Sequence, residues 1–373
     1  MNTLRKDFPN QQACFLDASG QASVDANEYW SPLIVSKLQI DAEIERLASL
    51  PRPDNGRRES RIVHPMAPAH APGLAPGIEV TLSVLKPGEE TSGFRHNATE
   101  VNFCIAGEGE TRIGDKLVRC RPYDVWNHPS FTRYVHRNTG SGLLVRLTYS
   151  NAPLLKNLQV YLPEDTDEDS SAAAPAREEP LDPARKSPFG MVPIGADGGL
   201  LMPYETLINP TAAESKCLHF PWETVKAELD KLQALGQTYI GRRLYMMYNP
   251  LTTRFNGITP NFFATMTIRP GGIVDRPHRH VSAAINYYFK GRGFSSVAGN
   301  RYEWGPGDLM LSAPGWAVHN HASYDEPVYE LTVQDQPLHI VMESLLWQED
   351  MKHPAKLLGS RPGFATNRGE VPA

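Results

Sequence analysis

The sequence lacks any long apolar run. Within its 373 residues no stretch approaches the roughly 20 apolar residues that a membrane-spanning helix needs. The first residues lack the apolar core of a secretory signal. Cysteine is also scarce, because the four cysteines form no Cys-x-x-Cys pair and have no metal-ligand spacing with histidine. Cys104 and Cys120 fall in neighbouring expected strands, so a disulfide between them is geometrically possible. We nevertheless expect reduced thiols and a cytoplasmic location.

A block of basic residues is missing as well. The 37 Lys and Arg residues are outnumbered by 42 Asp and Glu residues, which gives a net charge of −5. Nucleic acids and anionic membranes are therefore not expected as partners. The chain is 40% hydrophobic, as soluble globular proteins are, and its length suits two domains. Its 29 glycines and 32 prolines indicate the many turns of an all-β protein.

The pattern along the chain divides it into two β-rich halves. Residues 31–50 have apolar side chains at helical spacing, and residues 221–236 form an amphipathic pattern that starts after a proline and ends at a glycine. Residues 164–188 are acidic and rich in alanine, serine and proline, which is typical of a linker. We expect a helical N-terminal arm (1–60), an N-terminal barrel (61–162), an acidic linker with a connecting helix (163–240), a C-terminal barrel (241–347) and a tail (348–373).

The two halves resemble each other, which suggests an internal duplication. Residues 86–110 have the same shape as residues 269–293. In this comparison Phe94 takes the place of His278, His96 that of His280, Glu100 that of Ala284, and Tyr134 lies near the position of His319; His128 and His136 are close but out of place. We therefore expect a scaffold role for the first half, with His96 and Glu100 as a weaker candidate site for a divalent metal.

The second half contains three histidines with the spacing of a metal site. Side chains at i and i+2 share one face of a strand, so His278 and His280 point the same way while Arg279 points the other way. His319 is expected on a neighbouring antiparallel strand, where it would complete a triangle of imidazoles. A lone histidine is more often a packed residue than a ligand, but three at this spacing favour a metal site.

This half resembles a cupin metal motif. The resemblance rests on the His-x-His pair, a following glycine (Gly291 or Gly293), Gly307-Asp308, Pro314 and His319. Ala284 stands where the usual cupin motif has a glutamate, and the gentisate 1,2-dioxygenase-like enzymes also lack that glutamate. The runs HRHVSAAINYYFKGRG and WAVHNHAS of this chain resemble the two metal motifs of those enzymes. The resemblance implies a bicupin of two double-stranded β-helix (jelly-roll) barrels that binds Fe(II) and uses O2 to cleave a hydroxylated aromatic carboxylate. It departs from gentisate dioxygenases, in which the metal belongs to the first cupin.

Strand alternation and the resemblance together give a set of further candidate residues. Asn286 and Tyr288 continue the face of the metal ligands, and His321 lies two residues after His319. We assign these three residues to catalysis, although Tyr288 and His321 each have an alternative as packed residues. An arginine is expected to bind the substrate carboxylate, and an aromatic wall is expected beside the metal. The substrate-binding candidates are Arg243, Arg269, Phe263 and Trp316, with Arg242 as a third possible arginine.

Other functions fit parts of the pattern. A different metal-dependent bicupin oxidase or a decarboxylase is one alternative, but oxalate decarboxylase-like bicupins retain the glutamate that Ala284 replaces here. A non-enzymatic ligand-binding bicupin is another, although such proteins usually lose their histidines. Duplicated cupins commonly associate through their barrels and exchanged arms, so a homo-oligomer, a dimer or tetramer, is expected.

Overall fold

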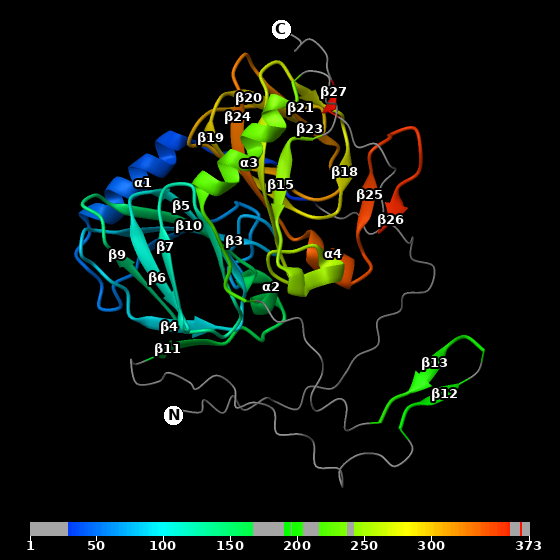
Figure 1. Ribbon diagram of the computed structural model, residues 1–373, viewed down its shortest axis with the longest axis horizontal. Helices are drawn as coiled ribbons and strands as arrows, with labels where there is room; N and C mark the ends of the chain where they lie inside the picture. Colours follow the sequence, from blue (N-terminus) through cyan, green and yellow to red (C-terminus); the bar gives the residue numbers. More distant parts are fainter. Residues whose placement is uncertain are drawn as a thin grey trace.

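The computed structural model describes residues 29–166, 190–194, 196–203, 216–236, 242–358 and 366–367. The chain forms two antiparallel β-barrels packed against each other, as Figure 1 shows. This is the expected all-β architecture with few helices. None of the helices in these ranges is long and apolar enough to span a membrane. Cys104, Cys120 and Cys217 are free thiols.

The N-terminal barrel consists of two facing sheets, of six and five strands, with the orders β14-β8-β5-β10-β3-β2 and β11-β4-β9-β6-β7. Its strands are β2 (Arg58–Ile62), β3 (Glu79–Leu85), β4 (Gly93–His96), β5 (Glu100–Ala106), β6 (Gly109–Ile113), β7 (Lys116–Cys120), β8 (Val125–His128), β9 (Tyr134–Asn138), β10 (Leu144–Ser150), β11 (Pro163–Thr166) and β14 (His219–Phe220). Helix α2 (Ala152–Asn157) follows β10, and a hairpin of β12 (Val192–Ile194) and β13 (Gly199–Leu201) comes later in the chain.

The C-terminal barrel repeats this plan with the orders β1-β22-β19-β24-β16-β15 and β21-β20-β23-β17-β27. Its strands are β1 (Leu33–Val35), β15 (Leu244–Met247), β16 (Phe263–Arg269), β17 (Val274–Asp275), β19 (Ala284–Lys290), β20 (Gly293–Val297), β21 (Asn300–Trp304), β22 (Leu309–Ala313), β23 (His319–Ser323), β24 (Val328–Gln334) and β27 (Thr366–Asn367). A third small sheet holds β18 (Arg279–His280), β25 (Leu346–Gln348) and β26 (Lys356–Leu357), while α4 (Gln336–Val341) and the 3₁₀ helix at Pro250–Phe255 lie nearby in the chain. The six-stranded sheets of the two barrels thus have the same strand order, in which β14, β8, β5, β10, β3 and β2 are matched by β1, β22, β19, β24, β16 and β15.

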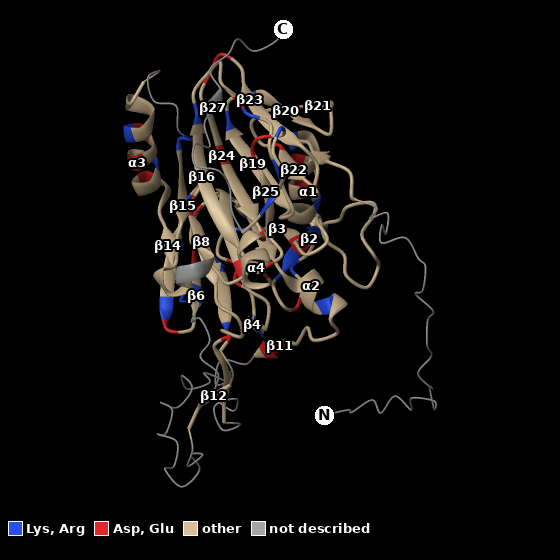
Figure 2. Ribbon diagram, turned by 90° about the vertical axis from the view of Figure 1, so that its right-hand side faces the viewer, with Lys and Arg blue, Asp and Glu red and all other residues tan. Residues whose placement is uncertain are grey.

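The two barrels are tied together by reciprocal connections. Strand β1 pairs with β22 of the C-terminal barrel, and the helix that follows it, α1 (Lys37–Ser49), packs on β2 and β3 of the N-terminal barrel. Strand β14 pairs with β8 of the N-terminal barrel, whereas the next helix, α3 (Trp222–Ala234), packs on β15 and β16 of the C-terminal barrel. Figure 2 shows α1 and α3 on opposite flanks of the molecule. Each barrel therefore receives its sixth strand from a segment whose helix covers the other barrel.

The main hydrophobic core lies between the barrels. Val80, Leu82 and Val84 of β3 and Ala264, Met266 and Ile268 of β16 belong to one buried cluster. Phe103 contacts Tyr287 across this interface, with ring centroids 5.5 Å apart. The alternate residues, such as Thr81 and Ser83, face the barrel interior instead. The six-stranded sheets are therefore apolar toward each other and polar toward the two barrel interiors.

The helix expected in the N-terminal arm is confirmed, but it is shorter than the helical pattern over residues 31–50. Residues Leu33–Val35 form a strand, and the helix begins only at Lys37, where Ser36 forms a capping box with Gln39. The branched residues Ile34 and Val35 suit an edge strand better than a helix. Strand β2 spans the expected limit at residue 60. The connecting helix is confirmed as α3, while residues 1–28 of the arm and most of the acidic linker lie outside the described ranges.

Candidate metal centre

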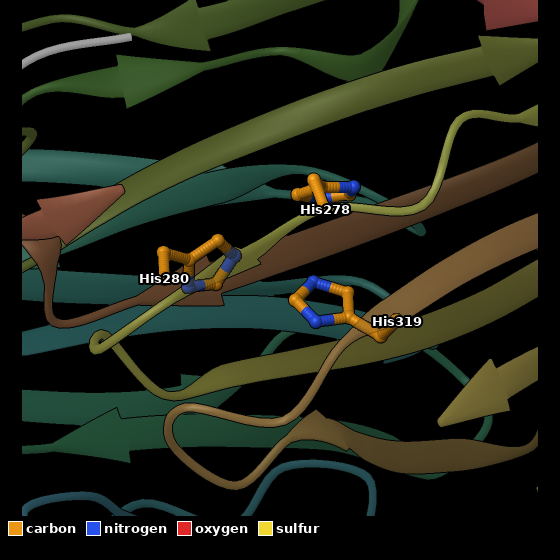
Figure 3. Close-up of side chains that lie close together, drawn as sticks. All are labelled: His278, His280 and His319. Carbon is orange, nitrogen blue, oxygen red and sulfur yellow. The ribbon is translucent and has the colours of Figure 1, made fainter. Parts of the chain in front are cut away.

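Three buried histidines converge inside the C-terminal barrel (Figure 3). His278 and His319 lie opposite each other in an antiparallel bridge, and His280 lies on β18, which pairs with β25. The ring centroids of His278 and His280 are 4.4 and 4.8 Å from that of His319. One ligand atom from each ring falls within 4.8 Å of the others.

A backbone carbonyl orients each of the three rings. Nδ1 of His278 lies 3.1 Å from the carbonyl oxygen of Arg276, and Nδ1 of His319 lies 2.9 Å from that of Ala317. Nδ1 of His280 lies 2.8 Å from the carbonyl oxygen of Ser282. Because a carbonyl only accepts, each Nδ1 carries the hydrogen and donates it. Each Nε2 is left with its lone pair, which is the arrangement that metal-binding histidines use.

The environment also keeps these histidines uncharged. Burial lowers the pKa of His278 and His280 well below the usual range, and it lowers the pKa of His319 to about 4. The nearby charge of Arg242 lowers all three pKa values further. Neutral imidazoles are the form that binds a metal, so the site fits a divalent transition metal at neutral pH.

No carboxylate joins the triad. Ala284 occupies the position of the usual cupin glutamate and lines the cavity beside the histidines. The carboxylates of Asp275 and Glu330 also line this cavity, but both pair with Arg269, at 3.1 and 3.0 Å. A metal held here would therefore have three neutral protein ligands and open positions for other molecules.

The histidines face a cavity of about 280 Å³, large enough for a small aromatic acid. Phe263 and Asn286, both expected from the sequence, line it. Asn286 is fixed by hydrogen bonds to Thr332 Oγ1 (2.8 Å) and Ser312 Oγ (2.5 Å). His321 also lines the cavity, and its Nδ1 lies 2.7 Å from Ser295 Oγ. The structure thus brings these three candidates to the same cavity as the triad.

Four other candidates have different surroundings. Tyr288 lies outside the cavity lining and stacks on Trp304, with ring centroids 3.8 Å apart, since this part of the strand reaches the packed end of the barrel. Trp316 is also absent from the lining, and its ring lies against Arg279. Arg243 and Arg269 do line the cavity, yet Arg243 donates to the carbonyl oxygens of Leu232 and Gly236 at the end of α3, and Arg269 is held by its two carboxylates.

Sequence reasoning missed one residue of the cavity lining and named another only as one of three possible arginines. Trp347 lines the cavity, and its ring lies 4.9 Å from that of His280. Trp347 belongs to β25, which follows His280 by almost 70 residues and carries no recognisable motif. Only the pairing of β25 with β18 shows that Trp347 lies near the histidines. Arg242 lines the cavity, and burial lowers its pKa to about 10, which leaves it charged at neutral pH.

The N-terminal barrel holds a different cluster at the equivalent place. Phe94 pairs with Tyr134 as His278 pairs with His319, which matches the comparison made from the sequence. Glu100 lies 2.9 Å from His96 Nε2 and 2.7 Å from His128 Nδ1. His128 was expected to be out of place, but strand pairing sets it directly opposite Glu100. Here the carboxylate is already shared by two imidazoles.

The fold defines a bicupin, and its second barrel holds a cluster of three histidines that could bind a metal ion. Residues 270–361 match the AraC-like ligand binding domain family. The fold is that of salicylate 1,2-dioxygenase from Pseudaminobacter salicylatoxidans, with a TM-score of 0.70 at 15% identity over 89% of this chain and 93% of that chain.

Comparison of the sequence gives relatives of higher identity than comparison of the fold. The chain is 26% identical to a 5-aminosalicylate 1,2-dioxygenase of Comamonas sp over 70% of its own length and 66% of that protein. It is 25% identical to a 1-hydroxy-2-naphthoate 1,2-dioxygenase of Nocardioides sp. (strain KP7) over 83% of its length and 75% of that protein. The resemblance to the gentisate 1,2-dioxygenase-like bicupins is confirmed by these relatives.

Proposed function

We propose that this chain is an Fe(II)-dependent dioxygenase that cleaves the ring of a hydroxylated aromatic carboxylate of the salicylate or gentisate kind. The observation that carries the proposal is the buried triad of His278, His280 and His319, whose ligand atoms lie within 4.8 Å of one another beside a cavity of about 280 Å³. The names of the relatives, all 1,2-dioxygenases of hydroxylated aromatic acids, supply the reaction class.

The ligand set suits the metal and the substrate proposed. Iron(II) held by three neutral imidazoles keeps its full positive charge and offers open positions where a chelating aromatic acid and O2 can bind and exchange electrons. Both oxygen atoms of O2 would end in the ring-opened product. The role of this chain's residues is to hold the metal, orient the acid and exclude water from the buried site.

Arg242 is the arginine best placed to bind the substrate carboxylate. Its charge is close enough to the triad to lower the pKa of His278, His280, His319 and His321. Arg242 also lines the cavity into which the triad faces. A guanidinium can bind a carboxylate through two parallel hydrogen bonds, which would fix the position of the aromatic ring.

Other cavity residues would position the ring and its hydroxyl group. Phe263 and Trp347 supply apolar surface for an aromatic ring. Trp304 Nε1 donates to Ser295 Oγ (2.9 Å), and we assign the Ser295 hydroxyl hydrogen to the bond with His321 Nδ1 (2.7 Å). In this arrangement His321 Nε2 carries a hydrogen that it can donate to a substrate oxygen, while Asn286 stays held by Thr332 and Ser312.

Metal analysis and oxygen uptake test the proposal. We expect about one iron per chain after anaerobic purification, oxygen consumption with a hydroxybenzoate or hydroxynaphthoate, and a ring-opened chromophore. Manganese with decarboxylation and no oxygen uptake would favour the decarboxylase alternative. Absence of bound metal under these conditions would contradict both enzymatic readings. We also propose a homo-oligomer, which the mass measured in solution by light scattering tests.

A further inference from the structure

The N-terminal barrel contains its own cavity, of about 610 Å³, which is larger than the one beside the triad. Its lining is dominated by charged side chains and also includes three aromatic rings, those of Phe94, Tyr134 and Tyr161. An interior that served only as scaffold would be filled with apolar side chains. The composition of this cavity calls for another explanation.

Most of the charges that line the cavity are matched by partners in the protein. Glu100 is bound by His96 and His128, as described above. Glu79 pairs with Arg61 and Lys156, both at 3.0 Å. These groups need no ligand to balance them.

Two charges in the lining have no partner of opposite charge within 4 Å among the described residues, namely Glu59 and Arg146. Glu59, which is exposed, accepts a hydrogen bond from Ser83 Oγ at 3.3 Å. Arg146, which is 2% exposed, donates to Asn102 Oδ1 and contacts His136 Nε2, each at 3.0 Å.

The sheet places these two charges at a fixed separation. Glu59 on β2 and Arg146 on β10 both lie opposite Ser83 of β3, one on each side. Residues in one such row point to the same face of a sheet, here into the barrel. Because neighbouring strands are about 4.8 Å apart, the two backbones are about 10 Å apart, with the cavity in front of them.

A buried donor without a hydrogen-bond partner lies in the same cavity. Arg57 lines it, and its side chain is only 10% exposed. Two of its nitrogens have partners, Asp165 at 3.3 Å and the carbonyl oxygen of Ser92 at 2.9 Å, but Nε has no hydrogen-bond partner among the described residues. A buried donor without a partner is costly, so it marks a place where a ligand oxygen would be stabilised.

We propose that this cavity binds a small zwitterion, an aromatic amino carboxylate, with its carboxylate on Arg146 and its ammonium on Glu59. A simple anion would meet Glu59 and Glu100, and a simple cation would meet Arg57 and Arg146. A ligand that carries both charges can pair with Glu59 and with Arg146 at the same time. The rings of Phe94, Tyr134 and Tyr161 provide the surface for its aromatic part.

Calorimetric titration of the full chain with L-phenylalanine tests this site. We expect about one molecule bound per chain. Removal of one charge from the ligand, in 2-phenylethylamine or 3-phenylpropionate, should weaken binding at least about tenfold, since a hydrogen bond to a charged group contributes that much. Glu59→Gln and Arg146→Gln should each weaken the binding of L-phenylalanine by a similar factor.

Matched surface substitutions serve as controls. Glu108 and Arg119 belong to the same barrel and have side chains 62% and 78% exposed, so Glu108→Gln and Arg119→Gln should bind L-phenylalanine as the unaltered chain does. No measurable binding, equal binding of the three ligands, or unchanged binding in both cavity variants would overturn the proposal. If a cavity variant fails to fold, the comparison of the three ligands on the unaltered chain still decides it.

Discussion

His278 and His319 exchange two backbone hydrogen bonds, at 3.0 and 2.8 Å, so two of the three candidate metal ligands are direct neighbours across an antiparallel pair. Their separation is set by the sheet rather than by flexible loops. Phe94 and Tyr134 stand in the same relation in the N-terminal barrel. The same backbone geometry therefore supports a pair of candidate metal ligands in one barrel and an aromatic pair in the other.

Replacement of a triad histidine should remove the metal. In His278→Ala or His319→Ala one of only three protein ligands is lost, so iron measured by plasma mass spectrometry should fall to background. His96→Ala is the matched control, because His96 is bound to Glu100 in the other barrel. Loss of metal in the His96 variant alone would place the metal in the N-terminal barrel and contradict our assignment of the ligands to the C-terminal barrel.

Arg242 and Arg243 are neighbours in the chain, yet their replacement should have different effects. Arg242→Met should lower kcat/KM for the aromatic acid by about 10- to 100-fold, since a charged hydrogen bond to the carboxylate is lost. Arg243→Met should instead lower the melting temperature, because Arg243 binds carbonyl oxygens at the end of α3. Equal kcat/KM for Arg242→Met and the unaltered enzyme would exclude Arg242 as the anchor.

The two tryptophans near the site provide a second matched pair. Trp347→Ala removes an indole that lies 4.9 Å from His280, so KM should rise about three- to tenfold while the metal is retained. Trp316→Ala should leave KM unchanged, because Trp316 packs on Arg279 outside the cavity. Steady-state oxygen uptake measures both, and the opposite ranking would restore Trp316 as the aromatic wall.

Arg269 should be essential for stability. Arg269→Met would leave Asp275 and Glu330 as buried carboxylates without their shared cation, which should cost about 3–5 kcal/mol in the free energy of unfolding. Denaturant unfolding followed by fluorescence measures this change. A stable variant with a large loss of substrate affinity would show that Arg269 binds substrate after all.

Much of the candidate site follows from the sequence because it depends on local geometry. The i and i+2 spacing of His278 and His280 predicts a shared face, and the absence of a glutamate at Ala284 predicts a three-histidine site. The position of a side chain is harder to predict when it depends on the pairing of strands that are far apart in the sequence. Trp347 reaches the cavity only because β25 pairs with β18, and no periodicity in the sequence indicates that contact.

Strand alternation also has a limit. It correctly placed Asn286 at the cavity, but Tyr288 on the same face lies where the barrel is filled by Trp304. Alternation gives the face of a residue but not its depth in the barrel. The fold itself was accessible, since turns, short strands and the repeated motif all indicate two β-barrels. The arm was predicted less well, because the pairing of β1 with β22 overrides its helical pattern.

The reciprocal position of β1 and β14 means that neither half can be separated cleanly by cutting between the barrels. A fragment that begins at residue 242 would lack β1, which leaves the edge of β22 with unpaired backbone groups. Such an edge invites pairing with a second fragment and aggregation. During synthesis the first barrel can be completed once β14 has emerged, whereas β1 must wait for a partner that is made almost 300 residues later. Expression of this protein as isolated halves should therefore fail unless residues 29–49 are supplied with the second half.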